Sequence, residues 1–461
     1  MEHPDHHAAL RQDRVPPLFC LIHVSIMDPN SAKWEHCLDH AALSDVGLRR
    51  SNNQDCMATA VAGSQEAWQQ RGHLFMVADG MGAHAAGELA SKLACDVVPL
   101  TYNKLAKDRT APEAMLDAVR EANSQINSRG QASDDFKGMG TTVDVLTLLP
   151  QGALLAHVGD SRVYRLRKNQ LEQLTFDHSL VWEMRAAGQI PDDEAPNYVP
   201  KNIITRSLGP NPNVQVDLEG PFPLEVNDTF LLCSDGLSGP VKDEELGTIL
   251  RCLSPAEAVQ SLVDLANLRG GPDNITVIVV RVTGPQIAKG STGEVTTTGP
   301  RPHPTVHPLL WTLLGAFGLA AIGAFALQFQ LVALAALVGT LIFALAVLVQ
   351  RYSDPGAAYV FDGRPLGKGP YTTIDCKPNA EIVARLATTV QELRGAAAHK
   401  NWDINWDRFN DLAAKATAAT QAADHAAAVQ EHCQTISFVM AELRRQHGDK
   451  PSGDDSSIDL F

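Results

Sequence analysis

Two apolar segments of this chain each end in an Asp-Gly pair, and a third acidic residue stands just before another apolar segment. Residues 74–78 lead into Asp79, residues 230–234 lead into Asp235, and Asp273 precedes the third segment. Carboxylates at strand ends collect charge at the rim of a sheet, which is costly unless a cation neutralises it. A single Asp-Gly pair is usually a turn. The three acids together indicate hard divalent metal ions held by oxygen ligands, and such ions typically serve hydrolytic chemistry.

Composition narrows the class of protein. With 461 residues, the chain is long enough for two or three domains, and its 44% hydrophobic and 20% charged residues are typical of a globular protein. The net charge of −15 argues against nucleic acid as the main partner. Eight cysteines without a CxxC pair indicate reduced thiols rather than a disulfide framework or a zinc site.

The first 283 residues are rich in apolar and β-branched runs. These runs predict strands at 73–78, 143–149, 153–158, 162–167, 229–233 and 275–281. Apolar periodicity predicts helices at 85–106, 112–128 and 255–268. Because 153–158 and 162–167 are too close for a crossover, we expect an α+β fold of antiparallel sheets with helices packed outside. We place this domain at 41–283, after a flexible leader at 1–40.

The centre of the chain is uncharged. A Thr, Gly and Pro-rich linker at 284–308 precedes residues 309–349, which contain no charged side chain. About 41 residues would extend roughly 60 Å as a helix, twice what one membrane span needs. The polar break at Gln328-Phe329-Gln330 therefore predicts a transmembrane hairpin with spans near 309–327 and 331–349. One long tilted helix or a buried helical pair is the alternative.

Basic residues flank both sides of this hairpin, which favours a cytoplasmic location for both of its ends. We predict a second linker at 350–378. The residues that follow are rich in alanine and have helical apolar spacing, so we predict a small helical domain at 379–447. The Asp and Ser-rich end, 448–461, is predicted to be a disordered tail.

The acids of the first half belong to a series of short motifs in a fixed order. The series is Ser44-Asp45-Val46-Gly47, Arg50-Ser51-Asn52-Asn53-Gln54-Asp55, Asp79-Gly80-Met81-Gly82, Gly138-Met139-Gly140-Thr141-Thr142, Gly159-Asp160-Ser161-Arg162, Thr205-Arg206-Ser207-Leu208-Gly209, Ser234-Asp235-Gly236 and Asp273-Asn274. Over roughly 240 of the 461 residues, this series resembles the metal-dependent protein phosphatase family, type 2C, in its bacterial form. The resemblance implies a four-layer α-β-β-α sandwich that holds two Mn²⁺ or Mg²⁺ ions at one edge.

The resemblance also assigns metal ligands by motif match. Asp79 would bridge both ions, Asp235 and Asp273 would complete one, the backbone carbonyl of Gly80 would reach the other, and Asp55 would hold metal-bound water. Two such ions can share a hydroxide nucleophile and neutralise phosphoryl charge during in-line displacement. Few direct protein ligands and several waters suit Mg²⁺ or Mn²⁺.

Two more residues acquire roles from the resemblance. Arg50 matches the phosphate-binding arginine, and a guanidinium can grip two phosphoryl oxygens at once. Asp160 matches the acid that, with Asp235, holds a third, weaker metal in bacterial members. A turn acid that caps the hairpin is the alternative for Asp160.

The chain also departs from the family pattern. Gln54 stands where many relatives have Glu, which weakens the expected binding of the second metal. Met81 stands where some members have a histidine proposed as proton donor; His84 is close, but a histidine without a ligand role fits there equally well. The polar stretch 182–204 corresponds to the flap beside the active site.

These features predict a protein serine/threonine phosphatase in the cell inner membrane, with its phosphatase domain cytoplasmic. Its partners would be phosphoserine and phosphothreonine proteins, an opposing Ser/Thr kinase and the membrane, without nucleic acid. A catalytically weak scaffold for a membrane signalling complex is the alternative. A phosphatase specific for antagonists of anti-sigma factors would share the fold.

Overall fold

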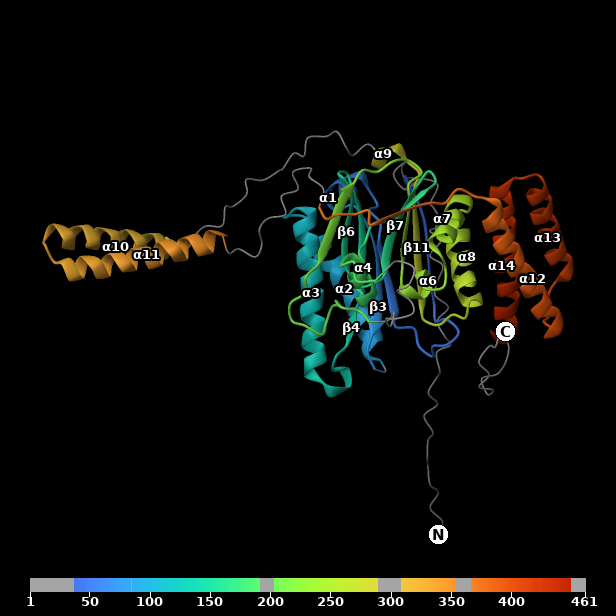
Figure 1. Ribbon diagram of the computed structural model, residues 1–461, viewed down its shortest axis with the longest axis horizontal. Coiled ribbons are helices and arrows are strands. Elements are labelled where there is room, and N and C mark those ends of the chain that lie inside the picture. Colours follow the sequence, from blue (N-terminus) through green and yellow to red (C-terminus); the bar gives the residue numbers. More distant parts are fainter. Residues whose placement is uncertain (1–36, 84, 191–202, 289–307, 353–365, 449–461) are drawn as a thin grey trace, which may run out of the picture. The chain divides into compact units, whose positions relative to one another are not determined.

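The computed structural model describes residues 37–83, 85–190, 203–288, 308–352 and 366–448 (Figure 1). The described residues divide into two compact units. One combines those before 293 with those after 363, and the other lies between 294 and 362.

The first unit contains two antiparallel sheets. The first sheet has, in spatial order, β1 (Leu38–Asp45), β11 (Ile275–Val282), β10 (Thr229–Cys233), β7 (Arg162–Arg167), β8 (Gln170–Gln173) and β12 (Thr372–Asp375). The second has β2 (Asp55–Ala60), β3 (His73–Met81), β5 (Val143–Leu149), β6 (Gly152–Val158) and β9 (Asp217–Phe222), with β4 (Gly140–Thr141) paired to β3. The expectation of antiparallel sheets is confirmed.

Helices cover the outer faces of both sheets (Figure 1). The second sheet is covered by α2 (Ala86–Leu105) and α3 (Ala111–Ala132), and the first by α7 (Asp243–Cys252) and α8 (Pro255–Leu268). Because side chains alternate along a strand, Phe75 and Val77 of β3 fill the core between the sheets while Met76 packs under the helices. The shorter helices are α1 (Gln65–Arg71), α4 (Leu180–Ala186), α6 (Asp235–Ser238) and α9 (Pro285–Ala288), with a 3₁₀ turn at Asp134–Phe136.

The sheet domain begins earlier than the predicted boundary at 41. Strand β1 starts at Leu38 and pairs with β11 along its whole length, so the predicted leader overlaps the sheet by three residues, 38–40. Its sequence, with one aspartate near each end and a histidine, lacks the continuous apolar run that marked the central strands.

The predicted linker at 350–378 requires correction. Glu219 in β9 accepts hydrogen bonds from the backbone N–H groups of Lys368 and Gly369, both at 3.0 Å, and from the Tyr371 hydroxyl at 2.5 Å. The chain then forms β12, an edge strand paired with β8. This segment was not predicted because a short, half-exposed edge strand needs no apolar alternation.

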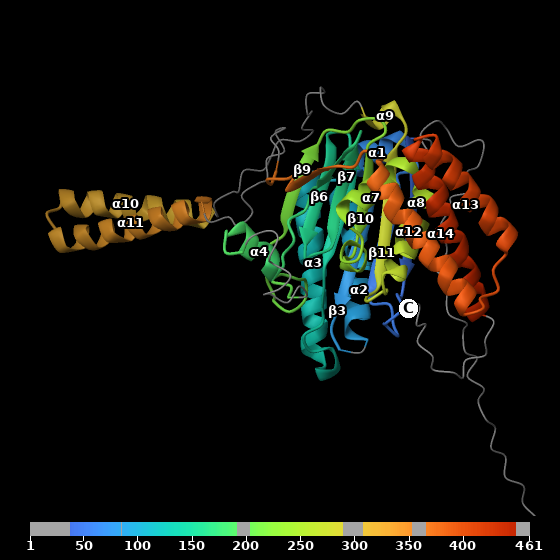
Figure 2. The same ribbon diagram turned by 45° about the vertical axis from the view of Figure 1, so that its right-hand side comes forward.

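Three C-terminal helices pack on the two-sheet domain as an additional layer. These are α12 (Ala380–His399), α13 (Trp406–Gln421) and α14 (His425–Gly448), and the views of Figures 1 and 2 place them outside α7 and α8. Asp264 of α8 is fully buried and accepts a hydrogen bond from Arg444 of α14 at 2.5 Å. The apolar core under α7 and α8 continues into the helices without interruption. The helical segment is therefore part of the first unit.

The second unit is the helical hairpin α10 (Pro308–Ala326) and α11 (Gln330–Tyr352). Its turn lies at the predicted polar break, where Gln328 adopts a left-handed backbone with φ of 63°. The helices are confirmed, but the prediction that they span a membrane is not supported. Among the described residues, we find no helix with both the length and the apolar character needed to cross a bilayer.

Candidate metal centre

Strand ends from both sheets bring the predicted acids to one edge of the sandwich. In the second sheet, Asp55 at the start of β2 pairs directly with Asp79 in β3. In the first sheet, β10 ends next to Asp235, and Asp273 lies two residues before β11. Asp160 follows β6 and leads into β7, whose first residue pairs with the end of β10.

Hydrogen bonds tie the two sheets together at this edge. The Ser234 hydroxyl, directly before Asp235, donates to Asp55 Oδ2 at 2.8 Å and accepts from the backbone N–H of Thr276 at 3.0 Å. The backbone N–H of Asp79 donates to the Thr142 hydroxyl at 2.8 Å. Asp55 and Asp79 are therefore held in place by neutral donors and acceptors, which do not compensate the charge of a carboxylate.

Burial and mutual repulsion raise the pKa values of four of these carboxyls. Burial raises the pKa of Asp55 to about 7 and that of Asp160 to about 8, and the charge of Asp235 adds to both shifts. Burial, reinforced by Asp55, Asp235, Asp160 and Asp273, raises the pKa of Asp79 well above its ordinary value. The pKa of Asp235 is also raised by burial and by Asp273, against a hydrogen bond with Asp79. Such a cluster favours either protons or a cation.

Unpartnered oxygens show that these residues fit a hard cation. One carboxyl oxygen of each of Asp55, Asp160 and Asp235 is buried without a hydrogen-bond partner. Leaving a buried acceptor unpaired is costly, and carboxylate oxygens are the ligands that Mg²⁺ and Mn²⁺ prefer. In the described part of the chain, no group of three or more His, Cys, Asp or Glu side chains is placed to hold a metal ion by itself.

Gly80 allows the backbone to approach closely beside these acids. A Cβ at this position would lie 2.1 Å from the carbonyl oxygen of Gly87 and 2.5 Å from that of Gln54. The N–H of Gly80 donates to this Gln54 oxygen at 3.1 Å, and the Ser91 hydroxyl donates to it at 2.6 Å. Gln54 thus supports the loop through its backbone.

Arg50 lies at the open side of the cluster. Its guanidinium donates to Asp273 Oδ2 at 2.7 Å, and the two side chains are 48% and 34% exposed. An exposed ion pair of this kind contributes little to stability, so the guanidinium can exchange its partner at low cost. The structure therefore places Arg50 beside Asp273.

Asn274 is a positioning residue to which the sequence assigned no role. Its Nδ2 donates to the carbonyl oxygens of Val46 and Asn52, both at 2.9 Å, and its Oδ1 accepts from the N–H of Gln54 at 2.8 Å. These three bonds hold both ends of the loop that carries Arg50. The residue appears in the motif Asp273-Asn274, but its spacing alone does not show which loop its amide holds.

Two predicted features cannot be placed. His84, the nearby histidine, lies outside the described residues, as does most of the flap at 191–202. Met81, which stands where some relatives have a histidine, pairs with Gly140 at the end of β3.

Known proteins match the part of the chain that forms this site. Residues 49–267 match the family described as protein phosphatase 2C. A putative protein phosphatase 2C-type of Streptococcus pyogenes is 39% identical over 244 residues, which are 51% of this chain and 94% of that protein. The chain belongs to the protein phosphatase 2C family. Phosphatase PhpP of Streptococcus pneumoniae is 37% identical over 255 residues, covering 53% of this chain and 97% of its own length.

Solved structures match a similar share of the chain. The S. agalactiae serine/threonine phosphatase is 37% identical and covers 53% of this chain and 99% of its own, with a TM-score of 0.49. The catalytic domain of PstP in complex with two manganese ions is 36% identical and covers 54% of this chain and 99% of its own, with a TM-score of 0.46. Family membership confirms the predictions of a protein phosphatase enzyme and of the Mn²⁺ or Mg²⁺ that this family uses.

We predict that the metal-free protein loses stability as the pH rises from about 4 to about 8. The pKa of Asp55 is about 7 and that of Asp160 about 8 in the folded state, above the ordinary aspartate value, so the folded state binds more protons in this window. Its free energy of unfolding therefore falls as the pH rises through this window. Thermal unfolding in chelator should show the decline, and Mn²⁺ should reduce it. A melting temperature in chelator that is constant between pH 5 and 8 would contradict the prediction.

Proposed function

We propose that this chain is a metal-dependent phosphatase of phosphoserine and phosphothreonine in proteins. The observation that carries the proposal is the set of buried carboxyl oxygens without partners, next to the half-exposed guanidinium of Arg50. Family membership supports the reaction type, and relatives named serine/threonine phosphatase support the substrate class. An opposing Ser/Thr kinase would supply the phosphoproteins.

Different acids of the cluster would bind different ions. The residues that would hold two core ions are Asp55, Asp79, Gly80, Asp235 and Asp273. Asp160, with its buried unpartnered oxygen, would hold a third ion together with Asp235. When bound, Mn²⁺ or Mg²⁺ neutralises phosphoryl charge and lowers the pKa of bound water.

Arg50 would orient the phosphoryl group. Its guanidinium is paired only with Asp273 among the contacts of the described residues, and about half of the side chain is exposed. A phosphoryl group offers two oxygens to the planar fork of an arginine, so bidentate binding would compete well with the single bond to Asp273. The loop of Arg50 is fixed by Asn274, which limits the reorganisation required.

The alternative, a catalytically weak scaffold, is less well supported. A scaffold would not need to keep acidic side chains buried at an energetic cost. All five predicted acids are present, and four of them have a raised pKa through burial. Retaining this arrangement is best explained by metal-dependent catalysis.

We expect the full-length protein to hydrolyse p-nitrophenyl phosphate with Mn²⁺ and to be inactive in excess chelator. Asp79→Asn should lower kcat by at least about 100-fold, because it removes the charge that would bridge both ions. It should not lower the melting temperature in chelator, because a neutral amide replaces a carboxyl that burial disfavours when charged. Steady-state kinetics and thermal unfolding provide both readouts.

Asp134→Asn, an exposed aspartate of the 3₁₀ turn, is the matched control and should keep full activity. In the same assay with phosphopeptide, Arg50→Ala should mainly raise KM. Absence of turnover with every divalent metal tested would reject the enzyme proposal, and an unchanged KM in Arg50→Ala would reject the phosphate role of that residue.

We also propose that the hairpin α10–α11 associates the enzyme with the inner membrane, with the phosphatase domain cytoplasmic. Large apolar side chains on the hairpin are exposed, including Leu319 (73%), Phe325 (77%) and Leu331 (84%). An exposed apolar surface of this kind is typical of membrane or protein contact. The cysteines in the described residues are all free, as in a reducing compartment.

Cell fractionation tests the membrane proposal. The full-length protein should sediment with membranes, and aspartate at Leu319, Phe325 and Leu331 together should move most of it to the soluble fraction. Leu100→Asp, at an exposed leucine of α2, is the control and should not change the distribution. A wild-type protein found only in the soluble fraction would contradict membrane association.

A further inference from the structure

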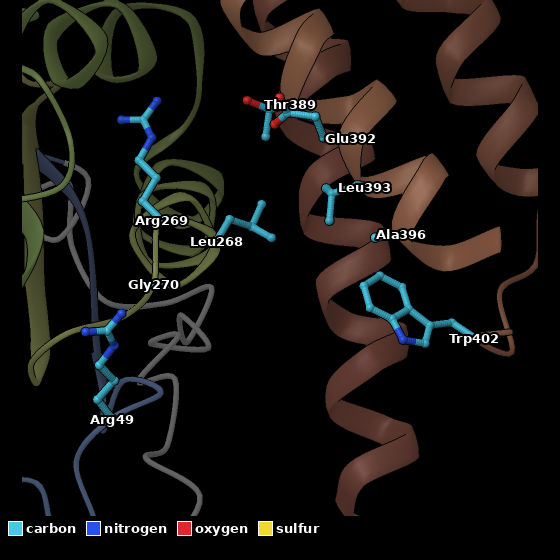
Figure 3. A pocket seen from close by; sticks show the side chains of 9 residues that line it. All are labelled: Arg49, Leu268, Arg269, Gly270, Thr389, Glu392, Leu393, Ala396 and Trp402. Atoms are coloured by element: carbon cyan, nitrogen blue, oxygen red, sulfur yellow. The ribbon is translucent and has the colours of Figure 1, made fainter. Parts of the chain in front are cut away.

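A pocket of about 380 Å³ lies between the end of α8 and the face of α12, beside the loop that carries Arg50 (Figure 3). The phosphatase domain contributes Arg49 and Leu268, and the C-terminal segment contributes Glu392, Leu393 and Trp402. Figure 3 shows Leu268 pointing across the pocket toward the helix that carries Leu393. The family match ends at residue 267. The pocket is therefore formed largely by residues outside the matched region.

Two backbone connections link this pocket to the candidate metal centre. Arg49 directly precedes Arg50, and its N–H donates to the carbonyl oxygen of Gly271 at 3.2 Å. Gly270, which also lines the pocket, stands three residues before Asp273. Three residues of extended chain reach at most about 11 Å. A group bound in the pocket thus lies within a few residues' reach of a phosphoryl group held by Arg50.

The lining is apolar in the middle and charged at the sides. Leu268 and Leu393 are buried and form the walls with the partly buried Trp402. In the described part of the chain, no hydrogen bond or ion pair occupies the side chain of Arg49 or of Glu392. By contrast Arg269, the other arginine of the lining, is bound to Glu245 at 2.7 and 2.8 Å. The pocket therefore offers one available cation and one available anion around an apolar patch.

This combination suits a polypeptide better than a small anion. A small anion would use Arg49 alone, whereas a peptide can place an apolar side chain in the centre and charges of either sign at the edges. The volume lies near the lower end of ligand pockets, which is enough for one large side chain.

We propose that this pocket binds a segment of the phosphoprotein substrate, taking a large apolar side chain about three to five residues from the phosphorylated residue. An acidic neighbour of that side chain would contact Arg49. The inference rests on the proposed phosphatase function and adds a specificity site to it, one that requires the C-terminal helices.

Peptide kinetics with the full-length enzyme test the pocket. Phosphothreonine peptides carry Leu or Ala at each position from two to six residues on either side of the phosphothreonine. We expect Leu at about three to five residues, on one side only, to raise kcat/KM about tenfold through KM, because it buries a leucine side chain. A peptide series without any such preference would overturn the proposal.

Two matched variants locate the effect. Ala396→Phe fills the pocket from α12 and should abolish the preference for Leu, whereas Ala398→Phe, exposed on the same helix and outside the lining, should keep it. Arg49→Glu should remove the benefit of an acidic neighbour, and Arg394→Glu, an exposed arginine of α12 outside the lining, should not. A preference for Leu that persists in Ala396→Phe would also overturn the proposal.

Turnover of p-nitrophenyl phosphate separates the two proposals, since this substrate is too small to reach the pocket. It should be equal in the wild type and in Ala396→Phe, which also shows that the variant is folded. If the wild type turns over p-nitrophenyl phosphate but shows no Leu preference, only the pocket proposal fails. If it turns over neither substrate, the proposed function fails and the pocket proposal fails with it.

Discussion

The crowding of buried carboxyls at one edge of the sandwich is the constraint on which the rest of the structure depends. Burial and the neighbouring charges raise the pKa of Asp55, Asp79, Asp160 and Asp235, so these groups are stable together only with protons or cations. The burial of apolar side chains offsets the cost of holding them there. One apolar core lies between the two sheets, and each sheet shares a further core with the helices that cover it. The fold therefore holds these carboxyl groups close together, and a bound divalent ion would lower the free-energy cost of doing so.

Neutral groups around the acids determine their geometry. Ser234 connects Asp55 of one sheet to β11 of the other, and Asn274 holds both ends of the loop of Arg50. Gly47 permits the same loop to pass the carbonyl oxygen of Asp273, because a Cβ there would lie 2.2 Å away and its φ is +79°. Since none of these groups carries charge, they fix positions without satisfying the carboxylates.

The sequence predicted what depends on local pattern and missed what depends on distant contacts. The buried central strands and the long helices were predicted within a few residues, because continuous apolar runs and helical periodicity are local signals. Asp79 and Asp235 were found because they stand at the ends of such strands, and Asp273 because it precedes one. By contrast, Asp55 and Asp160 were assigned by the family resemblance. Strand β12 and the role of Asn274 were missed, since the first is a polar edge strand and the second acts through loops distant in sequence. The packing of α14 on α8 includes the pair Asp264–Arg444, which no local pattern shows.

Calorimetry of Mn²⁺ binding to the metal-free, full-length protein tests the central claim most directly. Titrations near pH 7 in buffers of different ionisation enthalpy report the number of protons released on binding. Because burial raises the pKa of several of the site carboxyls, we expect saturable binding with net proton release that grows as the pH is lowered toward 6. Absence of saturable binding, or binding without proton release, would contradict the account.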